Sequence, residues 1–329
     1  MPTLRVLSAD QVLAAVTWPD AIEAMRSAFG QLSAGEAIMP PRTVIATRLG
    51  QTLVMPSYLS RTENLAIKIV SVHPGNRSRE LPLILGLLTV IEAATGAPIA
   101  VMDAATVTAV RTAAGSALAT ELLALSSADT LAVFGAGVQA RAHIAAIAAV
   151  RRLREVRIYT PSQQSARKLA DSINGQQAAG GTTARAVASP AEALRGAQLV
   201  VTATTAEEPV CDGRLMEVGT HINAVGAWRP NCRELDDGLV GRAKIVVDHR
   251  PAAWEEAGEL IQALRTGTIS LESIWADLGE LVNGSRPARQ SPDEITLFKS
   301  VGLAVQDAAL AATVLTGAER NSLGTLVEL

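Results

Sequence analysis

The chain has 329 residues, of which 48% are hydrophobic, and its formal net charge is −3. At roughly 150 residues per domain, this length predicts two domains, each with a core of its own. The balanced charge excludes a basic surface for nucleic acid or anionic lipid, and an aromatic content of 3% excludes base-stacking platforms. Apolar runs of about ten residues are too short to span a bilayer. The first residues lack the apolar core of a signal peptide and the two cysteines form no paired motif, so we expect a cytoplasmic protein.

In the N-terminal third, one helical pattern precedes a run of strand patterns. Residues 17–32 place Pro19 in a first helical turn and apolar side chains at helical spacing. Gly, Pro and Asn residues separate predicted strands at 43–47, 52–59, 65–72, 83–91 and 99–103. The turn TGAP joins the last two strands as a hairpin, so the sheet should be mostly antiparallel. A helix rich in Ala and Thr is predicted over 104–125.

From about residue 126, strand and helix patterns alternate, which is typical of a doubly wound parallel sheet. The predicted strands are 130–135, 155–160, 199–204, 221–226 and 243–248, and the predicted helices are 138–150, 165–173 and 191–194. Residues 294–315 are predicted to form one long helix that packs back on the first domain. The fold class is therefore α/β. We expect a Rossmann dinucleotide-binding domain over 126–300 and a second, α+β domain over 1–125 that the C-terminal residues 301–329 complete.

The stretch LAVFGAGVQA carries the sharpest motif. Gly135, Gly137 and Ala140 fill the GxGxxG/A pattern, which here follows a strand and opens a helix. The first glycine permits a tight turn and the second lets a pyrophosphate approach the backbone. The alanine keeps the helix close to the strand, and the helix N-terminus favours the anionic phosphates. A plain tight turn between strand and helix would give the same letters, but the flanking alternation favours a nicotinamide dinucleotide site.

The end of the second strand of this domain should read the cofactor ribose. An NAD enzyme usually has Asp or Glu there, whereas this chain has the residues Tyr-Thr-Pro-Ser. A 2′-phosphate would meet no carboxylate, and Thr160 and Ser162 could donate hydrogen bonds to it, with Arg167 nearby in the next helix. We therefore predict NADPH as the cofactor. The alternative is that these are turn residues and that NAD is also accepted.

Three cations occur where the surrounding pattern is apolar or small. Lys68 is the only charge in LAIKIVSV, Arg111 is the only charge in TVTAVRTAAGSALAT, and Arg42 opens a strand. Burying a lone ammonium is costly unless it is paired or serves a ligand, so the three cations predict a pocket for a small carboxylate. The alternatives are a solvent-facing edge-strand lysine, a structural ion pair for Arg111 and an exposed Arg42.

Other polar residues are interpreted as structural. The histidines His73, His143, His221 and His249 do not cluster at metal-ligand spacing, so no metal site is predicted. The acidic run EEAGE, residues 255–259, is predicted to lie on a solvated helix face.

Along nearly its whole length the chain resembles the ornithine cyclodeaminase/μ-crystallin family. The matching stretches are, in order, MPPRTV, VMPSYL, AIKIVSVHP, TGAPIAVMDA, RTAAGSALAT, FGAGVQA, GTHINAVGA, RELDD, EAGEL and TLFKSVG. The resemblance implies a homodimer, a nicotinamide cofactor, an α-amino or α-imino acid substrate, and a substrate-binding and dimerisation role for the non-Rossmann domain.

The resemblance also implies roles for individual residues. Arg42, Lys68 and Arg111 would hold the substrate carboxylate, Lys68 and Arg111 as catalytic residues, and the other substrate neighbours would be Met55, Trp228 and Val301. The pyrophosphate would be held by Gly135, Ala136, Gly137, Val138 and Gln139. Further cofactor contacts would be Thr160, Ser162, Thr202, Val225 and Ser300.

The stretch AVGAWRPNCRELDD separates the branches of this family. Cyclodeaminases carry an Asp just after the Gly-Gly or Gly-Ala turn, thought to transfer protons during deamination and ring closure, and Trp228 stands at that position here. An indole cannot accept a proton and Arg229 stays protonated, so that proton acceptor is missing. The pattern resembles the μ-crystallin and ketimine-reductase branch, in which Trp228 would be an apolar wall beside the substrate. The alternative is that Trp228 simply packs near the turn.

The predicted function is NAD(P)H-dependent reduction of the C=N bond of a small 2-imino acid to the L-amino acid. The expected substrates are cyclic, such as Δ1-pyrroline-2-carboxylate or Δ1-piperideine-2-carboxylate, and open-chain imino acids are the alternative. Three alternatives stay open: an ornithine cyclodeaminase, an alanine-type amino acid dehydrogenase, and a non-enzymatic small-ligand binding protein of the μ-crystallin kind. No nucleic acid or membrane partner is expected.

Overall fold

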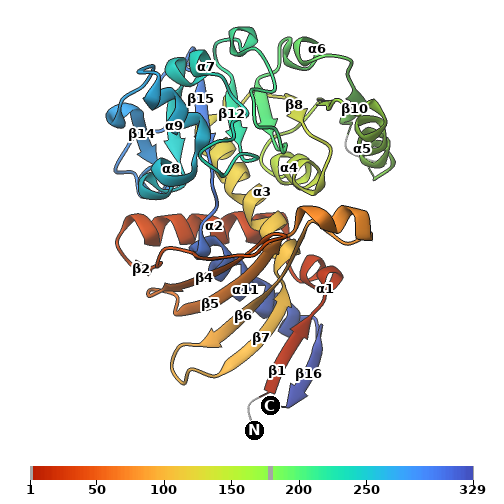
Figure 1. Cartoon of the computed structure of the whole chain (residues 1–329), viewed down its shortest axis with the longest axis vertical. Coiled ribbons are helices and arrows are strands. Elements are labelled where there is room, and N and C mark those ends of the chain that lie inside the picture. Colours follow the sequence, from red (N-terminus) through yellow and green to blue (C-terminus); the bar gives the residue numbers. More distant parts are fainter. Residues whose placement is uncertain (1–2, 177–180, 329) are drawn as a thin grey trace. The chain divides into compact units, whose positions relative to one another are not determined.

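The chain folds into two compact units, shown in the computed structural model of Figure 1, which describes residues 3–176 and 181–328. Unit 1 comprises Met1–Arg111 and Leu303–Leu329, and unit 2 comprises Thr112–Gly302. The first boundary falls within helix α3 (Ala104–Leu123), whereas sequence analysis placed it at residue 125. Within the described ranges, no helix has both the length and the apolarity needed to cross a membrane.

Unit 1 is built on a sheet with the strand order β16-β1-β7-β6-β5-β4-β2, and β3 also pairs with β4. Apart from the parallel pair of β1 and β7, the strands are antiparallel, as predicted, and β6 and β7 form the expected hairpin. The strands are β1 (Thr3–Leu7), β2 (Ala37–Ile38), β3 (Thr43–Ala46), β4 (Gln51–Leu59), β5 (Asn64–Val72), β6 (Ile84–Glu92), β7 (Pro98–Asp103) and β16 (Thr325–Glu328). The short strands β1, β2 and β16 were not predicted.

Helices pack on one face of this sheet. They are α1 (Ala9–Ala14), α2 (Trp18–Ser33) and α11 (Ala304–Arg320), and the 3-10 helix η1 (Pro74–Arg79) follows β5. The Thr17 side chain caps α2 by accepting a hydrogen bond from the Asp20 amide, and Pro19 lies in the first turn as predicted. Figure 1 shows α11, in blue, running across the sheet, where it contacts β4, β5 and β6 and also α1 and α2. At Gly317, a Cβ atom would lie 1.8 Å from the carbonyl oxygen of Ala15, so only glycine permits this close approach.

Unit 2 is a parallel sheet with the order β10-β9-β8-β11-β12-β15-β13-β14. The chain runs outward from β8 in both directions, so the topological switch point lies between β8 and β11. The strands are β8 (Thr130–Phe134), β9 (Glu155–Tyr159), β10 (Thr183–Ala186), β11 (Leu199–Thr202), β12 (His221–Ala224), β13 (Lys244–Val247), β14 (Ile274–Asp277) and β15 (Thr296–Lys299). This is the predicted Rossmann fold, and the α/β fold class is confirmed.

Helices and a two-sided core complete unit 2. Successive β8 residues alternate between two apolar clusters, Leu131 and Val133 in one and Ala132 and Phe134 in the other, because the strand is buried on both faces. Besides α3, the helices are α4 (Val138–Ala148), α5 (Gln163–Gln176), α6 (Pro190–Leu194), α7 (Asp237–Arg242), α8 (Arg250–Glu256), α9 (Gly258–Arg265) and α10 (Leu278–Val282), with 3-10 helices η2 (Gly213–Leu215) and η3 (Leu271–Ser273).

The prediction of one long helix over 294–315 is wrong. Its first part is strand β15, which is fully buried between β12 and β13, and α11 begins only at Ala304. Gly302, with φ of +83°, takes a left-handed conformation between the two elements. A short apolar run buried on both faces carries no period, so pairing with neighbouring strands decided its conformation.

Candidate active site

Lys68 lies in the middle of the unit 1 sheet, on the face that α11 covers. The residues aligned with it across the strands are Met55, Leu88 and Met102, all buried and apolar. Lys68 itself is 2% exposed, and its Nζ lies 2.6 Å from Oδ2 of Asp307 in α11. The alternative of a solvent-facing edge lysine is therefore wrong. Met55, a predicted substrate neighbour, is the buried partner of Lys68 on β4.

Arg111, at the end of unit 1 within α3, reaches the same carboxylate. Its Nε lies 3.3 Å from Oδ1 of Asp307, and its Nη1 donates a 3.1 Å hydrogen bond to Oε1 of Gln306. The structure therefore brings two of the three predicted cations to one buried acid. The ion pair that sequence analysis held as the alternative for Arg111 is present, and it joins Arg111 to Lys68.

The third cation, Arg42, is half-buried in the link between β2 and β3. The pKa of the Lys68 ammonium is lowered to about 8, mainly by burial, with Asp307 opposing this effect and the charges of Arg111 and Arg42 adding to it. Arg42 is thus close enough to act on Lys68. Lys68 and Arg111 contact Asp307 and Arg42 acts on Lys68, so all three predicted cations gather at one place.

Asp307 was missed by sequence analysis. The signal was available, because Asp307 is the only charge in LAVQDAALAATVL, the same criterion that singled out Lys68 and Arg111. A lone acid in an apolar helix indicates a buried cationic partner. Neither partner is near it in the sequence, so only the fold identifies them.

The glycine loop in unit 2 has the geometry that its motif predicts. Gly135 has φ of +116°, and a Cβ atom there would lie 2.5 Å from the carbonyl oxygen of Ala203. Gly137 is exposed, and a Cβ atom there would meet nothing within 4 Å. Gly137 is also the N-cap of α4 and offers no side-chain cap to the first amides, while Ala140 is fully buried against the strand. Gly135 is thus required by the fold. Gly137 leaves an open surface at the N-terminus of α4, where an anion is favoured.

The rest of the loop borders the same open surface. Val138 is 72% exposed, Ala136 and Gln139 are half-buried, and the carbonyl oxygen of Gln139 bonds to Nδ1 of His143. These residues fit a pyrophosphate held by backbone amides.

At the end of β9, hydroxyl groups stand where a ribose-binding carboxylate would be. Thr160 is half-buried, Ser162 is exposed, and the Ser162 Oγ lies 3.0 Å from that of Ser165. Arg167 is exposed on α5. The Tyr159 ring packs edge-on against Phe134, with ring centroids 5.9 Å apart, which fixes the end of the strand.

The hydroxyls of two predicted cofactor residues are engaged within unit 2. Thr202 is fully buried and donates a 2.8 Å hydrogen bond to Oε2 of Glu234. Ser300 donates to Oδ2 of Asp248, which also accepts from the amide of Val301 at 2.8 Å. The Val225 amide donates to the carbonyl of Thr202. These contacts show how the strand ends are fixed, and a cofactor role for these residues stays a prediction.

The loop that carries Trp228 is tied down by buried carboxylates. Glu234 accepts hydrogen bonds from the amides of Thr204 and Gly226, both at 2.7 Å. Glu259 accepts from the Glu234 amide and pairs with Lys299 at 3.0 Å. The prediction that residues 255–259 lie on a solvated face is therefore wrong for Glu259, which is fully buried at the start of α9.

Trp228 is half-buried and packs against the apolar cluster that also contains Val301. The Arg229 guanidinium lies 6.0 Å from the indole centroid and 3.7 Å from Glu207. Between Ala227 and Arg233 the sequence has no carboxylate. The loop therefore presents an indole and a guanidinium, and packing is part of the role of Trp228.

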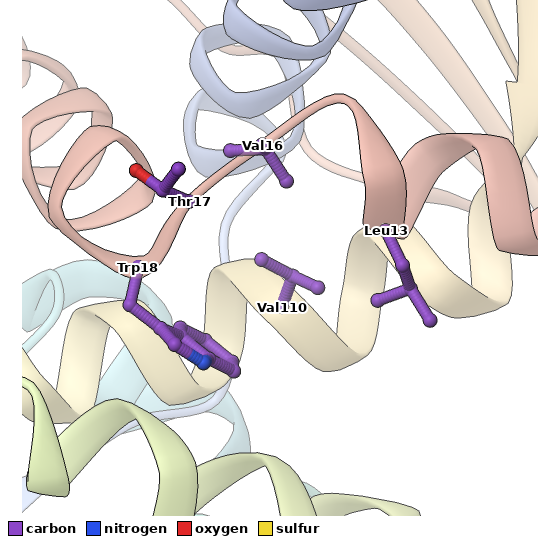
Figure 2. A pocket seen from close by; sticks show the side chains of 5 residues that line it. All are labelled: Leu13, Val16, Thr17, Trp18 and Val110. Carbon is purple, nitrogen blue, oxygen red and sulfur yellow. The ribbon is translucent and has the colours of Figure 1, made fainter.

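One pocket of about 90 Å³ lies in unit 1, between the start of α2 and the helix α3 (Figure 2). Figure 2 shows the side chains that line it, which are Leu13, Val16, Thr17, Trp18 and Val110. It contains no titratable group, so it offers no chemistry of its own. Among the described residues, no group of three or more His, Cys, Asp or Glu side chains could hold a metal ion.

Comparison with known proteins gives a consistent result. Residues 4–322 match the model of the ornithine cyclodeaminase/mu-crystallin family. The chain is 36% identical to a Delta(1)-pyrroline-2-carboxylate reductase of Bacillus cereus, over 99% of this chain and 100% of the relative. It is 34% identical to alanine dehydrogenase of Archaeoglobus fulgidus, over 100% of this chain and 99% of the relative.

Two solved structures have the same fold. Delta(1)-pyrroline-2-carboxylate reductase of Thermococcus litoralis, in complex with NADH and L-proline, has a TM-score of 0.93 and 37% identity, over 98% of this chain and 99% of that one. An archaeal alanine dehydrogenase dimer with bound NAD has a TM-score of 0.92 and 33% identity, over 99% of both chains. The chain belongs to the ornithine cyclodeaminase/mu-crystallin family.

Proposed function

We propose that the protein is an NAD(P)H-dependent reductase of small 2-imino acids. The observation that carries the proposal is the buried cluster of Lys68 and Arg111 around a single carboxylate, with Arg42 close enough to act on it. Such a cluster of cations suits a carboxylate ligand, and the glycine loop suits a dinucleotide. The relatives named as Δ1-pyrroline-2-carboxylate reductases support the same reaction.

The residues of the chain act mainly by binding and orientation. Arg42, Lys68 and Arg111 hold the substrate carboxylate and so fix the direction of the neighbouring C=N bond. The nicotinamide cofactor, when bound, supplies the hydride. Lys68 and Arg111 are the assigned catalytic residues, and the Lys68 ammonium, with a pKa of about 8, is a proton donor that the site can offer to an imine nitrogen near neutral pH.

The substrates we propose are cyclic ketimines, Δ1-pyrroline-2-carboxylate and Δ1-piperideine-2-carboxylate, which give L-proline and L-pipecolate. The family resemblance assigns Met55, Trp228 and Val301 as the apolar neighbours of the ring. The absence of an acid at the Trp228 position argues against ornithine cyclisation, because an indole accepts no proton.

For the cofactor, we propose a preference for NADPH over NADH. Thr160 and Ser162 can donate hydrogen bonds to a 2′-phosphate, and Arg167 adds a positive charge on the next helix. The test is kcat/KM with each cofactor in the wild type and in Thr160→Asp. The carboxylate should reduce the NADPH preference by about tenfold or more through repulsion. An unchanged ratio would remove this residue from the ribose site.

The activity is tested by following oxidation of NADPH and NADH with a panel of cyclic imines. Pyruvate plus ammonia tests an alanine-type dehydrogenase, and ammonia release from L-ornithine with catalytic NAD tests a cyclodeaminase. Tight cofactor binding without turnover on any substrate would indicate a binding protein. If the protein is this reductase, Lys68→Met should lower kcat/KM by roughly 30-fold or more. The substitution removes the ammonium that would contact the substrate carboxylate, and it leaves the buried Asp307 carboxylate without that partner.

We propose further that the protein is a homodimer that uses the sheet face opposite α11. Ile45, Ile69, Leu85 and Leu87 are each more than 40% exposed. The strand register places them on that face, because Leu87 aligns with Ile69 next to buried Lys68, and Leu85 aligns with Ile45 through Ser71 and Thr52. A group of exposed apolar side chains on one sheet face marks an interaction surface. A second copy of the chain is the proposed occupant, and the dimeric archaeal relative supports it.

A further inference from the structure

The Asp307 carboxylate bridges the two buried cations Lys68 and Arg111. Its Oδ2 lies 2.6 Å from Lys68 Nζ and its Oδ1 lies 3.3 Å from Arg111 Nε, and its side chain is 2% exposed. The strand β5, the helix α3 and the helix α11 thus meet at this acid. Each oxygen serves a different cation, so Asp307 fixes the separation between them.

The preceding residue strengthens the hold on Arg111. Oε1 of Gln306 accepts hydrogen bonds from Arg111 Nη1 at 3.1 Å and from the Leu303 amide at 2.8 Å. Gln306 is itself fully buried at the start of α11. Two consecutive residues of one helix therefore define where the guanidinium lies.

The charges around Lys68 show what else Asp307 does. The residues on neighbouring strands, Met55 and Leu88, are apolar, and α3 contributes Arg111 and the hydroxyl of Thr108, whose Oγ1 lies 3.5 Å from Nζ. With Arg42 in the β2–β3 link, the other charges that act on Lys68 are positive and favour loss of its proton. In these surroundings Asp307 is the group that favours the ammonium form.

We propose that Asp307 is a positioning residue for imino acid reduction, which holds Lys68 and Arg111 in place for the substrate carboxylate and keeps Lys68 protonated. This rests on the proposed function. A neutral amine would neither attract a carboxylate nor donate a proton to an imine nitrogen. The negative charge of Asp307 lowers the net positive charge of the site by one. It also keeps Lys68 in the ammonium form that the reaction uses.

The test is the pH dependence of kcat/KM in Asp307→Asn, which keeps the shape of the side chain and removes its charge. The basic limb of the profile, which Lys68 sets near pH 8 in the wild type, should move to lower pH by about one unit or more. Activity at the acid end should fall much less. A uniform loss with an unmoved limb would overturn the proposal, because a merely structural role predicts that result.

Two further variants separate charge from position. Asp307→Glu keeps the charge, so its limb should stay near the wild-type pH while KM rises. Lys68→Arg replaces the titrating group, so the limb should disappear in this variant and in its combination with Asp307→Asn. A limb that persists with Lys68→Arg would belong to another group and would overturn the assignment.

A binding measurement keeps the proposal independent of turnover. The Kd of L-proline should increase with rising pH as Lys68 loses its proton. The pH at the midpoint of this increase should be lower in Asp307→Asn than in the wild type. If Asp307→Asn fails to fold, Asp307→Glu tests the positioning role through its raised KM, and Lys68→Arg tests whether Lys68 is the titrating group. An unchanged KM in Asp307→Glu, or a limb that persists in Lys68→Arg, would then overturn the proposal. Should the wild type reduce no imine, the proposed function fails, while the pH-dependent binding of L-proline still decides the role of Asp307.

Discussion

The Lys299 ammonium lies 3.0 Å from Oε2 of Glu259, and both side chains are fully buried in unit 2. Lys299 ends β15 and also donates to the carbonyl oxygen of Ala227, while Glu259 accepts from the Glu234 amide. The pair thus joins the end of a central strand to both sides of the Trp228 loop. These two buried charged residues therefore fix the position of the Trp228 loop.

Breaking this pair should destabilise the protein strongly. Lys299→Met leaves Glu259 buried without its counter-ion, at an expected cost of about 3–5 kcal/mol in the free energy of unfolding. The double variant with Glu259→Gln should lose less than the sum of the two single variants, as a double-mutant cycle by urea unfolding can measure. As a control, Arg154→Ala breaks the exposed pair with Asp129 and should cost less than about 1 kcal/mol. Additive single effects at Lys299 and Glu259 would contradict the coupling.

The two glycines of the cofactor loop should respond differently to alanine. Gly135→Ala should lower stability by roughly 2 kcal/mol or more, because φ is +116° and the new methyl would meet the Ala203 carbonyl. Gly137→Ala has an extended backbone and open space, so its melting temperature should match the wild type. Its KM for the dinucleotide should nevertheless rise about tenfold or more, since the methyl occupies the surface proposed for the pyrophosphate. A normal cofactor KM in Gly137→Ala would contradict that placement.

His221 should make the fold sensitive to acid. Burial, followed by the charge of Arg289, lowers the pKa of this fully buried imidazole to about 3, against 6.5 for an unperturbed histidine. Between these two pKa values His221 is protonated in the unfolded chain but not in the folded one. The contribution of His221 to stability is therefore fully present above pH 6.5 and is lost progressively as the pH falls toward 3. The slope from this residue is at most about 1.4 kcal/mol per pH unit. Urea unfolding at pH 7 and pH 5 should show a smaller loss in His221→Gln, and equal losses would exclude this residue as the cause.

Charges on the open face of the unit 1 sheet should dissociate the proposed dimer. Leu87→Lys and Ile69→Lys change aligned residues of β6 and β5 that are 57% and 46% exposed. Burying either ammonium at an interface is costly, so both variants should sediment as monomers at concentrations at which the wild type is dimeric. Leu271→Lys, at a residue 58% exposed in unit 2, is the matched control and should leave the mass unchanged. A monomeric wild type would reject the dimer itself.

Trp228 should affect the substrate and not the cofactor. Trp228→Ala removes the apolar surface proposed for the ring of a cyclic imine, so KM for the imine should rise by roughly tenfold while KM for the dinucleotide stays constant. Trp228→Phe keeps an aromatic ring and should have the smaller effect. Equal changes in both KM values would indicate that the indole only supports the loop.

The sequence was informative wherever a pattern was local. The longer strands of unit 1, the alternation of unit 2 and the glycine loop each follow from residues close together in the chain, and all were predicted. The edge strands β14 and β16 were missed, as was β1, whereas β8 and β11, which are continuous apolar runs of similar length, were predicted. The strand β15 was read as helix because a short segment buried on both faces has no period that separates strand from helix.

The sequence by itself identified Lys68 and Arg111 as lone charges in apolar or small-residue segments, and left open whether each met solvent, an ion-pair partner or a ligand. Only the tertiary structure decided that the partner is Asp307, and that Glu259 is buried with Lys299 and not solvated. The physical reason is that the energy of a buried charge depends on which groups the fold brings within a few ångströms. Those groups come from elements far apart along the chain.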